Sequence, residues 1–93
     1  MTDPIPDPVE AEILRQTAAG GIDRSISPND VARALMAGAG PDAWRTRLGD
    51  VRRAAIRLAR QGTIEILRKG KPVAPDAARG VIRLRGATMA LPD

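Results

Sequence analysis

The chain has 93 residues, a net charge of +4 and a single aromatic residue, Trp44, and it contains neither cysteine nor histidine. This length suits one domain with a modest aliphatic core. Without Cys or His the chain has no disulfide, no thiolate, and neither the commonest zinc ligand nor the usual neutral-pH acid–base group. The acidic, proline-broken start MTDPIPDPVE is not a signal peptide, and no window approaches the roughly 20 apolar residues of a membrane span. We therefore expect a soluble, cytoplasmic protein.

Charge is distributed unevenly along the chain. Residues 1–44 hold three arginines against seven carboxylates, a net −4, whereas residues 45–93 hold twelve Arg or Lys against four carboxylates, a net +8. A GC-rich genome would explain the thirteen arginines against two lysines, but it would not explain why they cluster. A basic half folded against an acidic half suggests a positive face complementary to a polyanion.

The first predicted helix begins at a preferred capping pair, with Asp7 as the N-cap and Pro8 at the first helical position. It is expected to end at about Ala19, because two glycines follow. The side chains expected to face the core are Ile13, Leu14 and Thr17.

A second helix is predicted from Pro28 to about Met36, because Ser27 offers a cap, Pro28 suits the first position and Asp30 supplies a carboxylate in the first turn. The segment DRSIS between the two helices is long enough only for a single extended bridge centred on Ile26. The side chains that the second helix is expected to bury are Val31 and Leu35.

A third helical region is predicted from about Asp42 to Gln61, after the glycine–proline turn AGAGPD. Gly49 leaves two alternatives open: one helix, or a short turn around Trp44 followed by a main helix from about Arg47. At 100° per residue the apolar stripe comprises Leu48, Val51, Ala55, Leu58 and Ala59. The opposite face carries Arg53, Arg57 and Arg60, with Gln61 beside them and Arg52 at the edge.

After Gly62 the hydrophobic period changes to two. TIEIL and VIRLR alternate, which predicts two antiparallel strands. The inward-facing residues are Ile64 and Ile66 on the first strand and Ile82 and Leu84 on the second. The connecting stretch RKGKPVAPDAARG is predicted to be a basic loop with a protruding tip. Arg83 and Arg85 face away from the core, where they either contact a ligand or protect an exposed strand edge.

This element order predicts an α+β fold, a small winged helix-turn-helix with three helices plus a β-hairpin wing. We place the domain at residues 7–85, with a disordered tail at 1–6 and a loose C-terminal tail at 86–93. In this fold the third helix is offered to the DNA major groove, and the β-loop contacts backbone or minor groove beside it.

Several motifs match one family. They are Trp44-Arg45, Val51-Arg52, Leu58-Ala59, Gly62, Lys69-Gly70-x-Pro72-Val73, Arg79-Gly80 and Ile82-Arg83-Leu84-Arg85. On these residues the chain, over about positions 8–85, resembles a bacterial family catalogued as domain of unknown function 3253. The resemblance implies a winged-helix fold, and it supplies neither an activity nor a functional residue.

The basic third helix and the basic loop together predict binding of double-stranded DNA, as in a small transcriptional regulator. The candidate DNA-binding residues are Arg52, Arg53, Arg57, Arg60, Gln61, Arg68, Lys69, Lys71 and Arg79. A plainer interpretation exists for each group: the arginines of the third helix would form a solvated helix face, and the cations of the loop would form an ordinary polar hairpin tip. A different class of function, a winged-helix interaction module whose basic face binds an acidic protein partner, also stays open. A homodimer stays open too, because reading a palindrome needs two copies.

Other kinds of site have little support in the sequence. GAGPDA and KGKP do not match nucleotide-binding glycine motifs. Ser25 and Ser27 lack a histidine base, so we expect no enzyme, no metal and no cofactor. An enzyme acting on nucleic acid would need a carboxylate pair beside the basic face. Trp44 is expected to close the core, with its indole N–H finding a partner.

Overall fold

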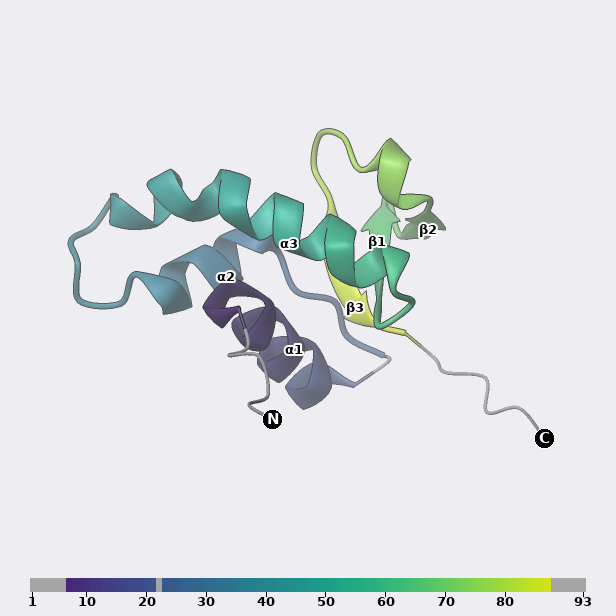
Figure 1. The fold of residues 1–93 in the computed structure, drawn as a ribbon, viewed down its shortest axis with the longest axis horizontal. Helices are drawn as coiled ribbons and strands as arrows, with labels where there is room; N and C mark the ends of the chain where they lie inside the picture. The colour runs from purple at the N-terminus through teal and green to yellow at the C-terminus, as the bar shows by residue number, and fades with distance from the viewer. Residues whose placement is uncertain (1–6, 22, 88–93) are drawn as a thin grey trace, which may run out of the picture.

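Three helices and a three-stranded antiparallel sheet make up the part of the chain that the computed structural model describes, residues 7–21 and 23–87. The tail predicted at residues 1–6 lies outside these ranges, as does most of the one predicted at 86–93. Figure 1 shows the longest helical segment running across the molecule, with the sheet at one end and the turn after the second helix at the other.

Helix α1 spans Pro8–Gly20 and begins at the predicted cap, because the Asp7 carboxylate accepts hydrogen bonds from the backbone N–H groups of Val9 and Glu10. Its buried residues are Val9, Ile13 and Thr17, which recur every four positions and so form one stripe. The expectation for Leu14 was wrong. It lies one position, about 100°, away from the centre of that stripe and is 36% exposed.

Helix α2 spans Pro28–Leu35 and starts with the predicted capping box. The Asp30 N–H donates to Ser27 Oγ at 3.1 Å, and the Ser27 N–H donates to Asp30 Oδ2 at 3.0 Å. Val31 is fully buried as expected, whereas Leu35 is half-buried and Ala32 takes the second fully buried position. Just before the helix, the predicted bridge at Ile26 pairs with Leu84.

The third helical region follows the second of the two alternatives. A 3₁₀ turn, η1, spans Ala43–Arg47, and helix α3 spans Leu48–Arg60. The predicted stripe is correct at Val51, Ala55 and Leu58, which are buried. The flanks of the stripe are buried less completely than expected. Leu48 and Ala59 are half-buried, while Ala54, which the wheel did not select, is fully buried.

The sheet has the order β2-β1-β3, with β1 at Ile64–Arg68, β2 at Lys71–Val73 and β3 at Arg83–Gly86. Strands β1 and β3 pair antiparallel with Ile66 opposite Leu84, and all four residues predicted to face inward are buried. Strand β2 was not predicted. It is short, and Pro72 argues against a strand unless, as here, that strand lies at the sheet edge.

The segment between β1 and β3 is therefore more structured than a single protruding loop. Lys69 and Gly70 form a two-residue connection from β1 to β2, with φ of 53° and 80°. Positive φ at both positions is typical of a type I′ hairpin turn, which matches the twist of its strands. After β2 the chain makes a 3₁₀ turn, η2, at Pro75–Ala77 and returns to β3.

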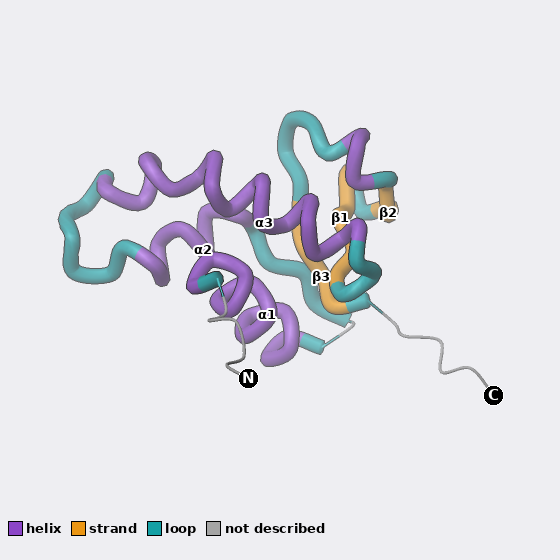
Figure 2. Tube along the Cα trace, viewed as in Figure 1, coloured by secondary structure: helices purple, strands orange, loops and turns teal. Residues whose placement is uncertain are grey.

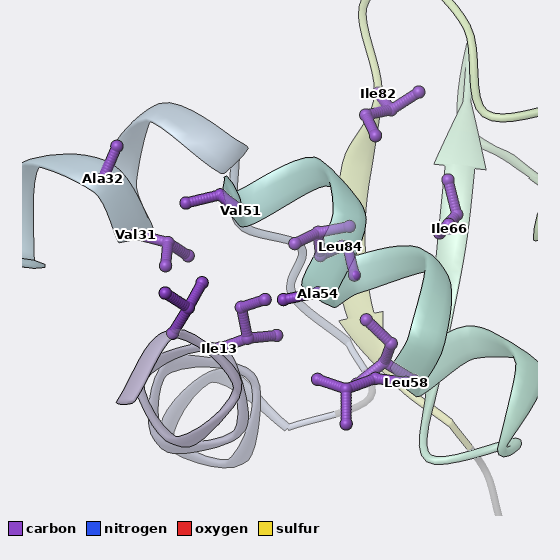
Figure 3. Close-up of a cluster of buried hydrophobic side chains, with 12 residues drawn as sticks. Ile13, Val31, Ala32, Val51, Ala54, Leu58, Ile66, Ile82 and Leu84 are labelled. Carbon is purple, nitrogen blue, oxygen red and sulfur yellow. The ribbon is translucent and has the colours of Figure 1, made fainter. Parts of the chain in front are cut away.

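The core lies where the three helices meet the inner face of the sheet (Figure 3). Its largest fully buried side chains come from every layer: Ile13, Val31, Val51, Ile66 and Leu84. In Figure 2 the strands lie by the C-terminal end of α3, on the right of the view, and α1 and α2 lie below the same helix. This is an α+β fold whose element order, with the Ile26 bridge on β3, is compatible with a winged helix-turn-helix.

Candidate nucleic-acid interface

Helix α3 presents its arginines away from the core, as its periodicity predicts. The side chains of Arg53, Arg57 and Arg60 are 67%, 45% and 64% exposed, and Arg52 is half-buried. Gln61 is exposed and serves as the C-cap of the helix. Helix α3 therefore places these predicted residues at the surface together.

Each of these four arginines has a partner in the described chain, and for Arg52, Arg57 and Arg60 that partner lies outside α3. Arg57 bridges to helix α1, with Nε 2.8 Å from Glu10 Oε2 and Nη2 3.2 Å from Asp7 Oδ2. Arg60 Nη2 lies 2.8 Å from Asp76 Oδ1 in η2. Within α3 itself, Arg53 pairs with Asp50 at 2.5 Å, while Arg52 donates to the backbone carbonyl of Gly80.

The tip of the β1–β2 hairpin is different. We use hairpin tip for Arg68, Lys69 and Lys71, three exposed cations around the two-residue turn. Together with Pro72 and Val73 they line a shallow depression of about 480 Å³. Within residues 7–21 and 23–87, none of the three has a carboxylate oxygen within 4.0 Å. Arg79, in the stretch between η2 and β3, is exposed and likewise without such a partner in the described chain.

The arginines of β3 support the fold. Arg83 donates to Ser25 Oγ at 2.6 Å and to the Ser25 carbonyl at 2.8 Å, which ties β3 to the segment before α2. Arg85 lies opposite Glu65 in the β1–β3 register and bonds to its carboxylate at 2.9 Å. A cross-strand ion pair of this kind stabilises a sheet.

Trp44 packs in η1, half-buried against the core, and its indole N–H donates to the carbonyl of Pro41 at 3.1 Å. The expected hydrogen-bond partner of the indole is thus present, but Trp44 is only half-buried, whereas it was expected to close the core. The guanidinium carbons of Arg33 and Arg45 lie 4.6 and 4.7 Å from the ring centroid, both within cation–π range.

Elsewhere on α1, the Arg15 guanidinium bonds to the Glu12 carboxylate at 2.5 Å. This hydrogen bond lowers the pKa of Glu12 despite partial desolvation, and Gln16 contributes in the same direction.

Two carboxylates do meet beside the basic face, the arrangement that an enzyme acting on nucleic acid would require. They are Asp7 and Glu10, and both are bound to Arg57, with the second oxygen of Asp7 capping α1. In the described part of the chain no group of three or more Asp, Glu, His or Cys side chains is placed to hold a metal ion. Ser27 acts as a helix cap, as predicted.

The described helices are all too short or too polar to cross a bilayer.

Sequence reasoning did not find the partners of the α3 arginines. Asp7, Glu10 and Asp76 are separated from those arginines by 50, 47 and 16 positions. The one available signal was the acidic first half, which indicated that carboxylates would fold against the basic second half without showing where.

The fold and this surface define a class, a small α+β domain with a basic hairpin whose element order is compatible with a winged helix. A family model described as Protein of unknown function (DUF3253) matches residues 6–87, so the chain belongs to that family and the resemblance is confirmed. No curated protein matches the sequence significantly.

Proposed function

We propose that this protein binds double-stranded DNA, as a small transcriptional regulator does, and that its hairpin tip makes the main contact with the phosphate backbone. The observation that carries the proposal is the hairpin tip itself. Three exposed cations lie at the two-residue turn, Lys69 within it and Arg68 and Lys71 at the strand ends that flank it, and no carboxylate oxygen of the described chain lies within 4.0 Å of them.

The shape of the hairpin supports this contact. Arg68 and Lys71 are direct partners across β1 and β2, and Lys69 lies in the turn between them. Cations on both strands and at the turn can each approach a different phosphate, and such contacts supply most sequence-independent affinity for a duplex. In a winged helix a hairpin of this kind contacts DNA beside the third helix, and the element order of this chain is compatible with that arrangement.

A cytoplasmic location belongs to the same proposal, because the protein must share a compartment with its DNA. Recognition of a palindromic operator would further require a homodimer.

The test is a salt titration of binding to a mixed-sequence duplex. The variant Arg68→Gln/Lys69→Gln/Lys71→Gln is compared with wild type and with the charge-matched variant Arg15→Gln/Arg24→Gln/Arg33→Gln, whose substitutions all lie in the acidic half. The slope of log K against log salt should flatten by about 2.7 in the hairpin variant, because each phosphate that a cation neutralises contributes about 0.9. Equal slopes in the two variants would contradict the proposal.

The second candidate is binding of an acidic protein partner through the same tip. The observation in its favour is the apolar pair Pro72 and Val73, which lines the depression together with the cations. If this second function is correct, the hairpin variant and the charge-matched variant should bind the duplex with equal slopes. The same titration therefore separates the two functions.

A further inference from the structure

We propose that α3 carries a second duplex-binding surface, which carboxylates of the same chain mask in this structure. The masked surface consists of Arg57 and Arg60, and the mask consists of Asp7, Glu10 and Asp76. This inference rests on the proposed DNA binding and names a further contact and its control.

The mask over Arg57 comes from the start of α1. Glu10 Oε2 lies 2.8 Å from Arg57 Nε, and Asp7 Oδ2 lies 3.2 Å from Nη2, so two carboxylates engage one guanidinium fork. Arg57, Asp7 and the neighbouring Arg47, Asp50 and Arg53 line one small depression of about 250 Å³ at the surface. The site is open to solvent, and an anion from outside can reach it.

The mask over Arg60 comes from η2, which follows α3 in the sequence, whereas α1 precedes it. η2 packs against α3 and places Asp76 Oδ1 2.8 Å from Arg60 Nη2. In the view of Figure 1, α1 lies below α3, and the short helical turn η2 lies above its C-terminal end. Two segments on different sides of α3 thus supply an anion to successive arginines of its outward face.

Each carboxylate here accepts from one nitrogen of its arginine, Nε or Nη2 of Arg57 and Nη2 of Arg60, and a phosphate oxygen would accept from the same donors. The carboxylates therefore compete with a phosphate for these arginines. The side chains of Asp76, Asp7 and Glu10 are 83%, 42% and 24% exposed, and ion pairs at the surface contribute little to folding stability. The mask lowers the affinity of α3 for phosphate and can be removed without disturbing the core.

It follows that wild-type protein contacts duplex through the hairpin tip while Arg57 and Arg60 stay with their carboxylates. Removal of the mask should allow each of these two arginines to neutralise a phosphate.

The experiment measures duplex affinity against salt for Asp7→Asn/Glu10→Gln/Asp76→Asn. Asparagine at position 7 retains an N-cap, so α1 keeps its start. The charge-matched control is Glu12→Gln/Asp23→Asn/Asp42→Asn, which removes three other exposed or half-buried carboxylates. Each set is also built with Arg57→Ala/Arg60→Ala, and circular dichroism verifies that all variants are folded.

We expect the unmasked variant to show a slope steeper than the control by about 1.8, at about 0.9 per additional phosphate, and we expect this difference to vanish when Arg57 and Arg60 are alanine. In the wild-type background, Arg57→Ala/Arg60→Ala should leave the slope unchanged.

The inference is overturned if the unmasked variant and its control have the same slope, or if alanine at 57 and 60 flattens the wild-type slope by about 1.8. The proposed function fails separately, when the hairpin variant of the preceding section binds like its own control. If only the unmasked variant binds the duplex, the inference of a masked surface on α3 is supported and DNA binding by the wild-type protein is refuted. If no variant binds, both are refuted.

Discussion

Helix α3 and the hairpin tip are the two most basic surfaces of this protein, and they differ in how their charge is balanced. On α3, Arg53, Arg57 and Arg60 each have a carboxylate within 2.5–3.2 Å. At the hairpin tip, no described carboxylate approaches the three cations. A count of basic residues along the sequence ranks α3 first, yet the net charge available to a polyanion is greater at the hairpin.

An arginine cluster in a sequence shows where positive side chains are concentrated. Which of them stay unpaired depends on the carboxylates that folding brings near them. Residues 1–44 carry a net −4, and two of their carboxylates end on α3. The hairpin tip keeps its charge because the described chain brings no carboxylate oxygen within 4.0 Å of its three cations.

The largest expected change in stability comes from a core substitution, which tests whether α3 and the hairpin unfold as one cooperative unit. Leu84 is fully buried, pairs with Ile66 on β1 and bridges to Ile26. Leu84→Ala should lower the free energy of unfolding by about 2–5 kcal/mol, because a cavity remains where the side chain packed. Urea unfolding is followed by circular dichroism and by Trp44 fluorescence, and the two transitions should coincide.

Val81→Ala is the control for this change, because Val81 is 88% exposed and its truncation should alter stability by less than about 0.5 kcal/mol. If the two probes separate in Leu84→Ala, the region around Trp44 unfolds apart from the remaining secondary structure, and the protein is not one cooperative unit.

A smaller effect concerns the α3 side of the comparison. Asp7 both caps α1 and contacts Arg57. Asp7→Ala removes both interactions and should cost about 0.5–2 kcal/mol, most of it from the cap. Asp7→Asn keeps the cap and should cost less than about 1 kcal/mol, the ordinary value of an exposed ion pair. Thermal unfolding of the two variants measures the difference, and equal destabilisation would show that the ion pair contributes more than the cap.

The smallest effect concerns the hairpin side. Lys69 has a φ of 53°, a left-handed conformation that strains a residue with a Cβ. Lys69→Gly should relieve this strain and raise stability by up to about 1 kcal/mol, while the removal of one cation flattens the duplex salt slope by about 0.9. Stability and affinity should thus move in opposite directions. Lys71→Gln, which removes the same charge without the change in the turn, should flatten the slope and leave the stability near that of wild type.

Local signals predicted much of the fold. The capping pair at Asp7, the capping box at Ser27 and the alternation around Ile64 and Ile82 each placed an element correctly, because those interactions lie within a few residues. Strand β2 escaped prediction because Pro72 reads as a strand breaker, and only its edge position makes it acceptable.

The candidate site was harder to predict. The wheel correctly placed the arginines of α3 at the surface, since burial of Val51 and Leu58 fixes the helix orientation. Their ion pairs depend on how α1 and η2 pack against α3, which no local pattern specifies. The burial of Leu14 was also not predictable from a local pattern. An apolar residue next to a buried stripe is buried or exposed depending on how the neighbouring elements pack.

The bridge between Ile26 and Leu84 also bears on the order in which the chain folds. The adjacent contact from Arg83 to Ser25 spans 58 positions, whereas the β1–β2 hairpin closes over a two-residue turn. Closing a long loop costs more chain entropy than closing a short one, so contacts of high sequence separation form slowly. Docking of β3 onto the segment before α2 is therefore expected to complete the native structure, after the hairpin and α3 have formed.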